Sequence, residues 1–149
     1  RSILMIYRNI KKNLPKNLEA HKDERGEIFD IFYKVNIEHV AIIDSKPNTL
    51  RGNHYHKKSN QYTYILSGSF EVLLAPSDQP ANVKKVVVRA GEMISIPSGV
   101  IHQFKAVERA VMIEMDTESR EGSGYEDDLF RVNIEYNQWY KSLKIDLDI

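Results

Sequence analysis

The stretch Arg51-Gly52-Asn53-His54-Tyr55-His56 is followed by Gln61 and Gly68, and a second stretch runs from Gly91 through Pro97-Ser98-Gly99 to His102. His54 and His56 are two residues apart, so on a strand both rings point to one face. Gln61 begins the next β-rich run and His102 follows a Pro-x-Gly turn, so both could reach the same space. Three neutral imidazoles and an amide oxygen inside a barrel would suit one divalent transition metal: Zn²⁺, Fe²⁺, Mn²⁺, Ni²⁺ or Co²⁺.

The rest of the chain consists of short β-rich runs separated by turn residues, a pattern typical of a sandwich or barrel. The predicted strands are residues 28–33, 39–44, 61–66, 69–74, 83–88, 93–96, 101–107 and 110–115. Ser67-Gly68, between two of these runs, indicates a hairpin. Because few helical patterns occur and strands do not alternate with helices, the sequence predicts an all-β fold. We expect residues 117–128 to form a loop or flap and residues 129–149 a C-terminal extension of a strand and a short helix.

Size and composition limit the possible classes of function. A chain of 149 residues has the usual size of one domain, so we expect a single domain over residues 1–149. Lys plus Arg and Asp plus Glu each number 21, and this balance argues against binding to nucleic acid or an anionic membrane. No apolar run approaches the roughly 18 residues of a membrane span. The absence of cysteine excludes disulfides and thiolate sites and fits a reducing cytoplasm.

The two histidine stretches combine into the pattern His-x-His-x4-Gln-x6-Gly, then Gly-x5-Pro-x-Gly-x2-His. This pattern resembles the two-part signature of the cupin family, over roughly residues 25–116, which we expect to form the core. The resemblance implies a double-stranded β-helix, or jelly-roll barrel, that is commonly dimeric and often holds one metal inside. It places His54, His56, Gln61 and His102 on the ligand positions.

The chain departs from the family pattern at three places. Gln61 stands where the family usually has glutamate, and a neutral amide oxygen binds a hard cation less tightly than a carboxylate does. Ala106 stands where the second motif often has asparagine. The early Gly-x5-His spacing is replaced by Arg51-Gly52-Asn53-His54.

This replacement looks like the nucleotide-sugar branch of the superfamily, the deoxysugar 3,5-epimerases and sugar 3,4-ketoisomerases. Residues 23–26, 68–72 and, in part, 125–131 are similar to segments of these enzymes. They generally work without metal and use a histidine as base on a carbon next to a keto group, which suits an imidazole whose pKa lies near working pH. The resemblance implies that His54 is the base, His56 orients or relays, and Arg51 holds a phosphate. His102 fits metal-binding cupins and the epimerases better than the ketoisomerases.

A tyrosine or a second histidine is expected to donate or return the proton. Tyr62 and Tyr64 flank the predicted barrel, and Tyr125 lies on the possible flap. Of these we take Tyr64 as the candidate catalytic residue, with Tyr62, Phe104 and Arg131 as candidate substrate contacts. Aromatic side chains on these strands would equally suit packing of the barrel wall.

The main hypothesis is therefore an isomerase or epimerase of a nucleotide-linked keto sugar in surface-polysaccharide or deoxysugar biosynthesis, with no nucleic-acid or membrane partner. One alternative is a metal-dependent cupin of other chemistry, such as a dioxygenase or an isomerase of a small acid or free sugar. Another is a non-catalytic cupin that binds a sugar or acid. A homodimer is expected in each case, because the exposed edges of a small barrel need covering. The sequence has no Walker loop, dinucleotide fingerprint, His-Glu-x-x-His or Gly-x-Ser-x-Gly motif.

Overall fold

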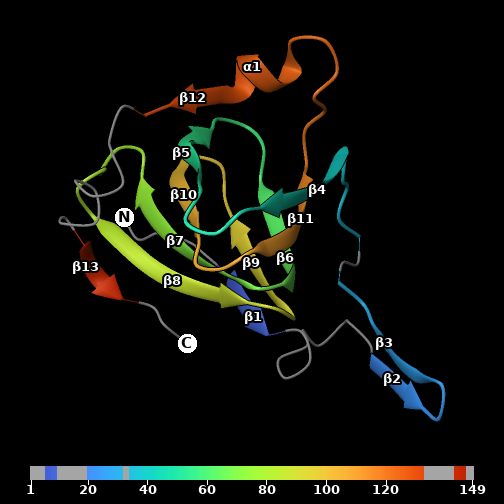
Figure 1. Cartoon of the computed structure of the whole chain (residues 1–149). Helices are drawn as coiled ribbons and strands as arrows, with labels where there is room; N and C mark the ends of the chain where they lie inside the picture. Colours follow the sequence, from blue (N-terminus) through green and yellow to red (C-terminus); the bar gives the residue numbers. More distant parts are fainter. Residues whose placement is uncertain (1–5, 10–19, 32–33, 133–142, 147–149) are drawn as a thin grey trace.

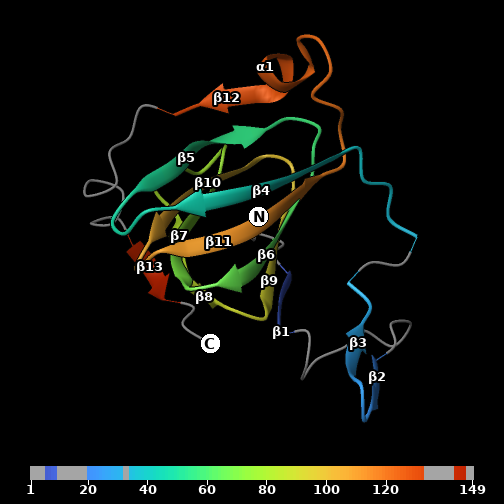
Figure 2. The ribbon, with the colours of Figure 1, turned by 45° about the vertical axis from the view of Figure 1, so that its right-hand side comes forward.

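A computed structural model describes residues 6–9, 20–31, 34–132 and 143–146. Within these residues two larger sheets face each other and close into a barrel (Figures 1 and 2). One sheet has five strands, in the order β1 (Ile6–Asn9), β9 (Glu92–Ile96), β6 (Gln61–Ser67), β11 (Ala110–Asp116) and β4 (His39–Ser45). The other has six, in the order β12 (Leu129–Arg131), β5 (Leu50–His56), β10 (Val100–Ala106), β7 (Ser69–Pro76), β8 (Val83–Arg89) and β13 (Leu143–Asp146). The prediction of an all-β barrel is confirmed.

Strands that are distant in sequence pair directly in both sheets. β6 lies between β9 and β11, and β10 lies between β5 and β7, all with antiparallel pairing. β13 is an exception, because it pairs parallel to β8. This long-range pairing brings β5, β6 and β10, which carry the histidine and glutamine motif, around one interior.

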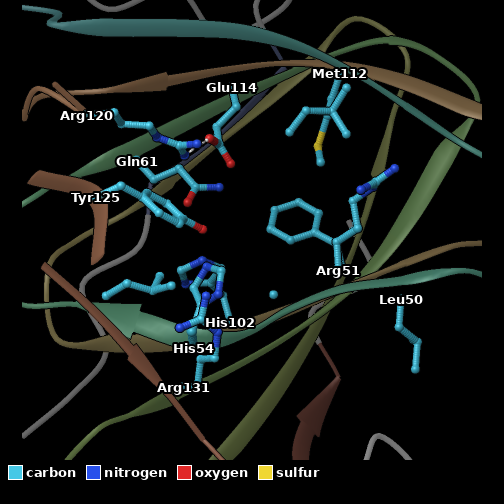
Figure 3. Close-up of a pocket in the computed structure, with 14 residues that line it drawn as sticks. Leu50, Arg51, His54, Gln61, His102, Met112, Glu114, Arg120, Tyr125 and Arg131 are labelled. Atoms are coloured by element: carbon cyan, nitrogen blue, oxygen red, sulfur yellow. Dashed lines mark hydrogen bonds and ion pairs between the residues drawn. The ribbon is translucent and has the colours of Figure 1, made fainter. Parts of the chain in front are cut away.

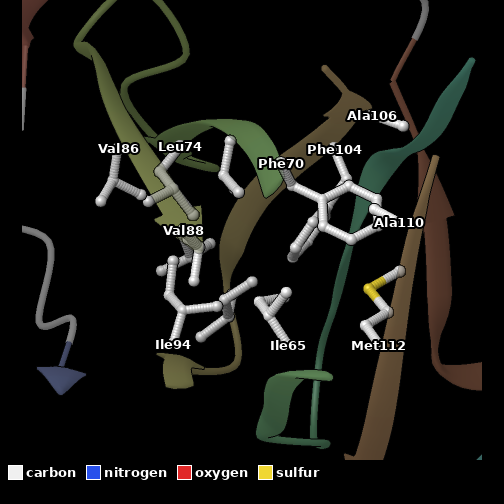
Figure 4. Packing of buried hydrophobic residues seen from close by; sticks show 13 residues of the cluster. Ile65, Phe70, Leu74, Val86, Val88, Ile94, Phe104, Ala106, Ala110 and Met112 are labelled. Atoms are coloured by element: carbon white, nitrogen blue, oxygen red, sulfur yellow. The ribbon is translucent and has the colours of Figure 1, made fainter. Parts of the chain in front are cut away.

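The apolar core lies between the two sheets (Figure 4). Side chains alternate between the two faces of each strand, and those on the inner face form the core. On β6, Thr63 and Ile65 are fully buried, whereas Tyr62 and Tyr64 are only partly buried. Phe70 and Phe104 meet edge to face in the core, with ring centroids 5.7 Å apart. Complete burial of one such side chain favours folding by roughly 1.5–3 kcal/mol.

Ser67-Gly68 joins β6 to β7, but the prediction of a hairpin is wrong, because β6 pairs with β9 and β11 in one sheet and β7 pairs with β8 and β10 in the other. The turn is a corner at which the chain crosses from one sheet to the other. Gly68 has φ +73°, and a Cβ at this position would lie 2.4 Å from the carbonyl oxygen of Arg109. The glycine is therefore required both by its backbone conformation and by the close approach of the chain before β11.

The predicted strand over residues 28–33 is placed differently. β3 (Gly26–Phe29) pairs with β2 (Ala20–Asp23) in a separate two-stranded sheet, which projects away from the barrel (Figures 1 and 2). The Asp23 carboxylate accepts the Arg25 backbone N–H at 2.9 Å and pairs with its guanidinium, which stabilises the turn and sets the start of β3 earlier than predicted. Residues 32–33 lie outside the described residues.

The segment predicted as a loop or flap, residues 117–128, ends in the short helix α1 (Gly124–Asp128) and leads into β12. β12 pairs with β5, so α1 lies at the end of the barrel beside the histidine strand (Figures 1 and 2). In the C-terminal extension the predicted strand corresponds to β12. The predicted helix is wrong for residues 143–146, which form β13 because they pair with β8. Residues 133–142 and 147–149 of this extension lie outside the described residues. Among the described residues, no helix is long and apolar enough to cross a membrane.

Candidate functional site

Three histidines from two neighbouring strands meet inside the barrel. His54 and His56 lie on β5, and His102 lies on β10 directly opposite His54. The ring centroid of His102 is 4.7 Å from that of His54 and 5.6 Å from that of His56. One nitrogen of each ring lies within 4.8 Å of the corresponding atoms of the other two. The structure thus gathers the three imidazoles at one point.

The surroundings of His102 decide which of its nitrogens carries the proton. The residue is 1% exposed, and its Nδ1 lies 3.0 Å from the Val100 carbonyl oxygen. Because a carbonyl only accepts hydrogen bonds, Nδ1 is the donor and Nε2 keeps its lone pair. Nε2 is buried with no hydrogen-bond partner. A buried polar atom without a partner is uncommon and indicates that a ligand, a water or a metal belongs at this point.

Gln61 offers a second buried acceptor in the same cavity. Its Nε2 donates to the Thr63 hydroxyl at 3.2 Å, which fixes the orientation of the amide. Its Oε1 is buried without a partner, like Nε2 of His102. Three imidazole nitrogens and one amide oxygen form a donor set that fits a divalent transition metal.

The cavity lined by His54, His102 and Gln61 has a volume of about 340 Å³, a size that suits a small-molecule ligand. Figure 3 shows His54 and His102 on one side of it and Glu114 on the other, with Gln61 and Tyr125 between them. Polar groups therefore face the cavity from β5, β6, β10, β11 and α1.

Burial keeps the histidines neutral. It lowers the pKa of His54 to about 4, and the nearby His56 and the cations of Arg131 and Arg120 act in the same direction. Burial also lowers the pKa of His56 and His102, although the Asp128 carboxylate opposes this effect at His56. At neutral pH each ring is therefore an acceptor, able to take a proton or to bind a metal.

A carboxylate pair faces the histidines from β11. Glu114 and Asp116 are both buried, and one Arg120 nitrogen donates to Glu114 Oε2 at 2.6 Å and to Asp116 Oδ2 at 3.3 Å. Burial, followed by the charge of Asp116, raises the pKa of Glu114 to about 7. Asp116 Oδ2 also lies 3.0 Å from His39 Nδ1 on β4. At neutral pH, Glu114 can therefore exist both with and without its proton.

Asp128 fixes the other side of His56. The Asp128 Oδ2 atom is 3.7 Å from His56 Nδ1. The same carboxylate accepts the backbone N–H groups of Lys58 at 2.7 Å and Ser59 at 3.1 Å. Asp128 therefore ties α1 to the loop after β5 and places a negative charge behind the His56 ring.

Three of the residues predicted to contact substrate line the cavity: Arg51, Phe104 and Arg131. Arg51 donates to the Ser45 hydroxyl at 2.7 Å and to the Asp44 carbonyl at 3.0 Å, which holds its guanidinium at the cavity wall. Phe104 is buried, and its ring lies edge to face with His102. Arg131 pairs with Glu126 and is largely exposed, at the mouth of the cavity.

The structure does not bring Tyr62 and Tyr64 to the cavity. Side chains alternate along β6, and Gln61 and Thr63 face inward, so the two tyrosines lie on the outer face of the sheet. The prediction of Tyr64 as a catalytic residue and Tyr62 as a substrate contact is corrected accordingly. Tyr125 on α1, which the sequence placed on a possible flap, lines the cavity instead, with its ring centroid 6.3 Å from that of His56.

Glu114 and Arg120 were not predicted as site residues. A signal for Glu114 was available, because it lies two residues after the core residue Met112, on the same face of the strand, in the otherwise apolar run 110–115. Arg120 gave no such signal, since its position depends on the path of the segment after β11.

Comparison with known proteins identifies the family to which this chain is similar. The family described as Cupin matches residues 38–132, from β4 to the end of β12. The search of curated proteins returned no match. A solved 3,4-ketoisomerase from Helicobacter canadensis is similar to this chain with a TM-score of 0.68 and 18% identity, covering 94% of this chain and 97% of the other.

Two further solved structures share the fold. QdtA, a sugar 3,4-ketoisomerase from Thermoanaerobacterium thermosaccharolyticum in complex with TDP, has a TM-score of 0.65 and 19% identity over 92% of each chain. A dTDP-4-dehydrorhamnose 3,5-epimerase from Sulfolobus tokodaii has a TM-score of 0.61 and 19% identity, covering 90% of this chain and 88% of the other. At these identities the likeness is one of fold. Since the family match spans the barrel from β4 to β12 and the strands form the expected jelly roll, the chain belongs to the cupin family.

Proposed function

We propose that the protein is an isomerase or epimerase that moves a proton beside the keto group of a nucleotide-linked sugar, in deoxysugar or surface-polysaccharide biosynthesis. The observation that carries this proposal is the arrangement of His54, a neutral imidazole, in the same cavity as the Tyr125 hydroxyl. A base and a proton donor that face one substrate are the minimum for this chemistry. The folds of the ketoisomerases and the epimerase support the substrate class.

In this reaction His54 accepts the proton from the carbon next to the carbonyl group. The electron pair of the broken C–H bond forms the double bond of an enediol, and the carbonyl oxygen gains a proton. If a proton returns to the same carbon from the other face, the product is the epimer. If a proton is instead added to the former carbonyl carbon, and the hydroxyl on the adjacent enediol carbon loses its proton, the product is the isomeric ketone. Tyr125 is the candidate donor in place of Tyr64. His56, next to Asp128, orients or relays.

The nucleotide part of the substrate would lie at the mouth of the cavity. Arg51 and Arg131 line it with guanidinium groups, which suit the planar, two-point recognition of a phosphate. Phe104 and Met112 supply an apolar wall for the sugar ring. Binding of the diphosphate at the mouth would hold the keto sugar against the imidazoles.

Two measurements test the function. Calorimetric titration with dTDP and UDP should give binding in the micromolar to millimolar range, and a dTDP-linked 4-keto-6-deoxy sugar in D2O should take up deuterium and change into a new keto sugar by NMR. His54→Asn should abolish both changes while leaving nucleotide binding in place. The lack of nucleotide binding at millimolar concentration together with the lack of deuterium uptake would refute the proposal. Binding without deuterium uptake would favour the non-catalytic sugar-binding alternative.

A metal-dependent activity is the second candidate, and a specific observation favours it. Nε2 of His102 and Oε1 of Gln61 are buried without partners beside His54 and His56. These four residues would hold one divalent transition metal, which when bound would supply Lewis-acid or redox chemistry. Elemental analysis of protein purified without chelator distinguishes the candidates, since a stoichiometric metal would support this one.

We also propose a homodimer. On the edge strand β4, Val40 and Ile42 are 62% and 72% exposed, and Leu66 on β6 is 47% exposed. Ile42 pairs across the sheet with Ile113 of β11, so apolar side chains continue from β4 onto β11 on the outer face. A second copy of the chain would cover this face and the open edge of β4.

A further inference from the structure

The short helix α1 does not by itself explain how Tyr125 is held in the wall of the cavity. α1 has five residues, and its N-cap residue Ser123 makes no capping hydrogen bond from its side chain. A helix of this length is not stable by itself, so contacts with the barrel must hold it in place. Tyr125 is also the one tyrosine among the described residues that lines the cavity.

The C-terminal end of α1 is well attached. Asp128 accepts the backbone N–H groups of Lys58 and Ser59, and its own carbonyl oxygen accepts the Lys57 N–H at 3.1 Å. The next residue, Leu129, already pairs with His56 on β5. These contacts fix the end of the helix and leave its start, which carries Tyr125, to be fixed by something else.

Arg120 contacts the start of α1. Its guanidinium carbon lies 4.1 Å from the centroid of the Tyr125 ring, and Figure 3 shows Arg120 beside Glu114 and Tyr125. One of its nitrogens donates to Glu114 and to Asp116 on β11. A guanidinium is planar, so its edge can bond carboxylates while its face lies against an aromatic ring. One side chain thus connects the barrel wall to the Tyr125 ring.

We propose that Arg120 is a positioning residue, which holds the Tyr125 hydroxyl towards the imidazoles by bridging Glu114 and Asp116 of β11 to the Tyr125 ring. The inference rests on the proposed function for the reaction in which Tyr125 acts. The proposed role of Arg120 does not require contact with the substrate, because one guanidinium nitrogen already donates to two carboxylates of β11. Its effect passes through Tyr125.

A double-mutant cycle tests this dependence. With the dTDP-linked keto sugar as substrate, Arg120→Gln should lower kcat at least about tenfold and change KM less than about threefold, since displacement of a catalytic group acts mainly on the chemical step. Arg120→Lys keeps the charge but not the planar face, and it should restore only part of the activity. In a Tyr125→Phe background, Arg120→Gln should cause less than about a twofold further loss. If Arg120→Gln instead lowers kcat by the same factor in the Tyr125→Phe background as in the wild type, the proposal is overturned and Arg120 contacts the substrate directly.

A second measurement does not need turnover. In hydrogen–deuterium exchange of the ligand-free protein, Arg120→Gln should speed exchange in residues 121–127 at least about fivefold and leave β11 unchanged. Arg109→Lys is the matched control, because Arg109 pairs with Asp44 at 2.6 Å on the outside of the barrel. Unchanged exchange in residues 121–127 would overturn the proposal even if the protein is active. Faster exchange in a protein without turnover would support the positioning role and refute only the proposed function.

Discussion

His54 and His102 are direct cross-strand partners on β5 and β10, and their rings meet edge to face with centroids 4.7 Å apart. The register of this pairing shifts between His102 and Gln103. Gln103 lies opposite Gly52, so Asn53 is the extra residue of a β-bulge. Gly52 and Asn53 both have positive φ, of 96° and 61°. Since side chains alternate along a strand, a slip of one residue would turn a ring out of the barrel. The backbone at residues 52–53 therefore sets the geometry of the three imidazoles.

Gly52→Ala is expected to destabilise the protein by roughly 2–4 kcal/mol and to disturb the site. A Cβ at Gly52 would lie 2.7 Å from the His102 carbonyl oxygen, in a backbone conformation that L-residues rarely adopt. The control is Gly91→Ala, at φ +84° but with nothing within 4 Å of the new Cβ, which should cost only about 1 kcal/mol. Urea denaturation followed by circular dichroism measures both, and equal costs would contradict the explanation.

The gathering of the histidines was predicted partly from local features and partly from the resemblance to the cupin signature, which placed His102 with His54 and His56. The pairing of β10 with β5 that brings His102 to them is long-range. His54 and His56 share a strand face by their spacing, and the Pro97-Ser98-Gly99 turn comes before the strand that carries His102. The wall opposite them was not predictable in the same way. Arg120 lies beyond the end of β11, and no periodicity specifies that its chain turns back over the cavity.

Tyr64 shows a different failure. Once Gln61 is taken to face inward, the period of two requires Tyr62 and Tyr64 to face outward, so the sequence itself contained the correction. Tyr125 could not be chosen from sequence, because α1 has too few residues for a periodic pattern and is held in place by Arg120 and Asp128.

Tyr125→Phe is therefore expected to lower kcat for the keto sugar by about 10²-fold or more, because the variant keeps the ring and loses the hydroxyl proton. Tyr64→Phe removes the same hydroxyl from the outer face of β6 and should change kcat less than about twofold. Steady-state kinetics on the two variants give the comparison. A similar loss in both would mean that the tyrosine on the outer face takes part in the reaction.

Metal affinity should depend on the charge at position 61. Calorimetric titration of chelator-treated protein with Ni²⁺ or Co²⁺ should show one site, and His102→Ala should weaken it at least about tenfold. Gln61→Glu adds a carboxylate next to the three imidazoles and should tighten binding about tenfold or more. His39→Ala, in the separate cluster of His39, Glu114 and Asp116, is the control. Equal affinities of the wild-type and His102→Ala proteins would refute a site at the imidazoles.

Glu114 should make the protein less stable as the pH rises. Its folded-state pKa of about 7 lies above the ordinary value of 4.5, so the fold favours the protonated carboxyl, and this contribution is lost between pH 4.5 and 7. Glu114→Gln is neutral at every pH, so its stability relative to wild type should rise by up to about 3 kcal/mol from pH 5 to pH 8. Urea denaturation with EDTA present measures the difference. The control Glu126→Gln should show no such trend, because the pKa of this exposed carboxyl is lowered by Arg131.

The proposed dimer depends on the outer apolar face of β4. Ile42→Glu would place two buried carboxylates against an apolar partner surface, a cost that would favour separate chains. Light scattering after size-exclusion chromatography should give twice the 17.3 kDa of the chain for wild type and 17.3 kDa for Ile42→Glu. Val107→Glu adds the same charge at an exposed apolar residue in the turn after β10 and should leave the dimer intact. A monomeric wild-type protein, or a dimer that Ile42→Glu does not disturb, would show that this face is not the interface.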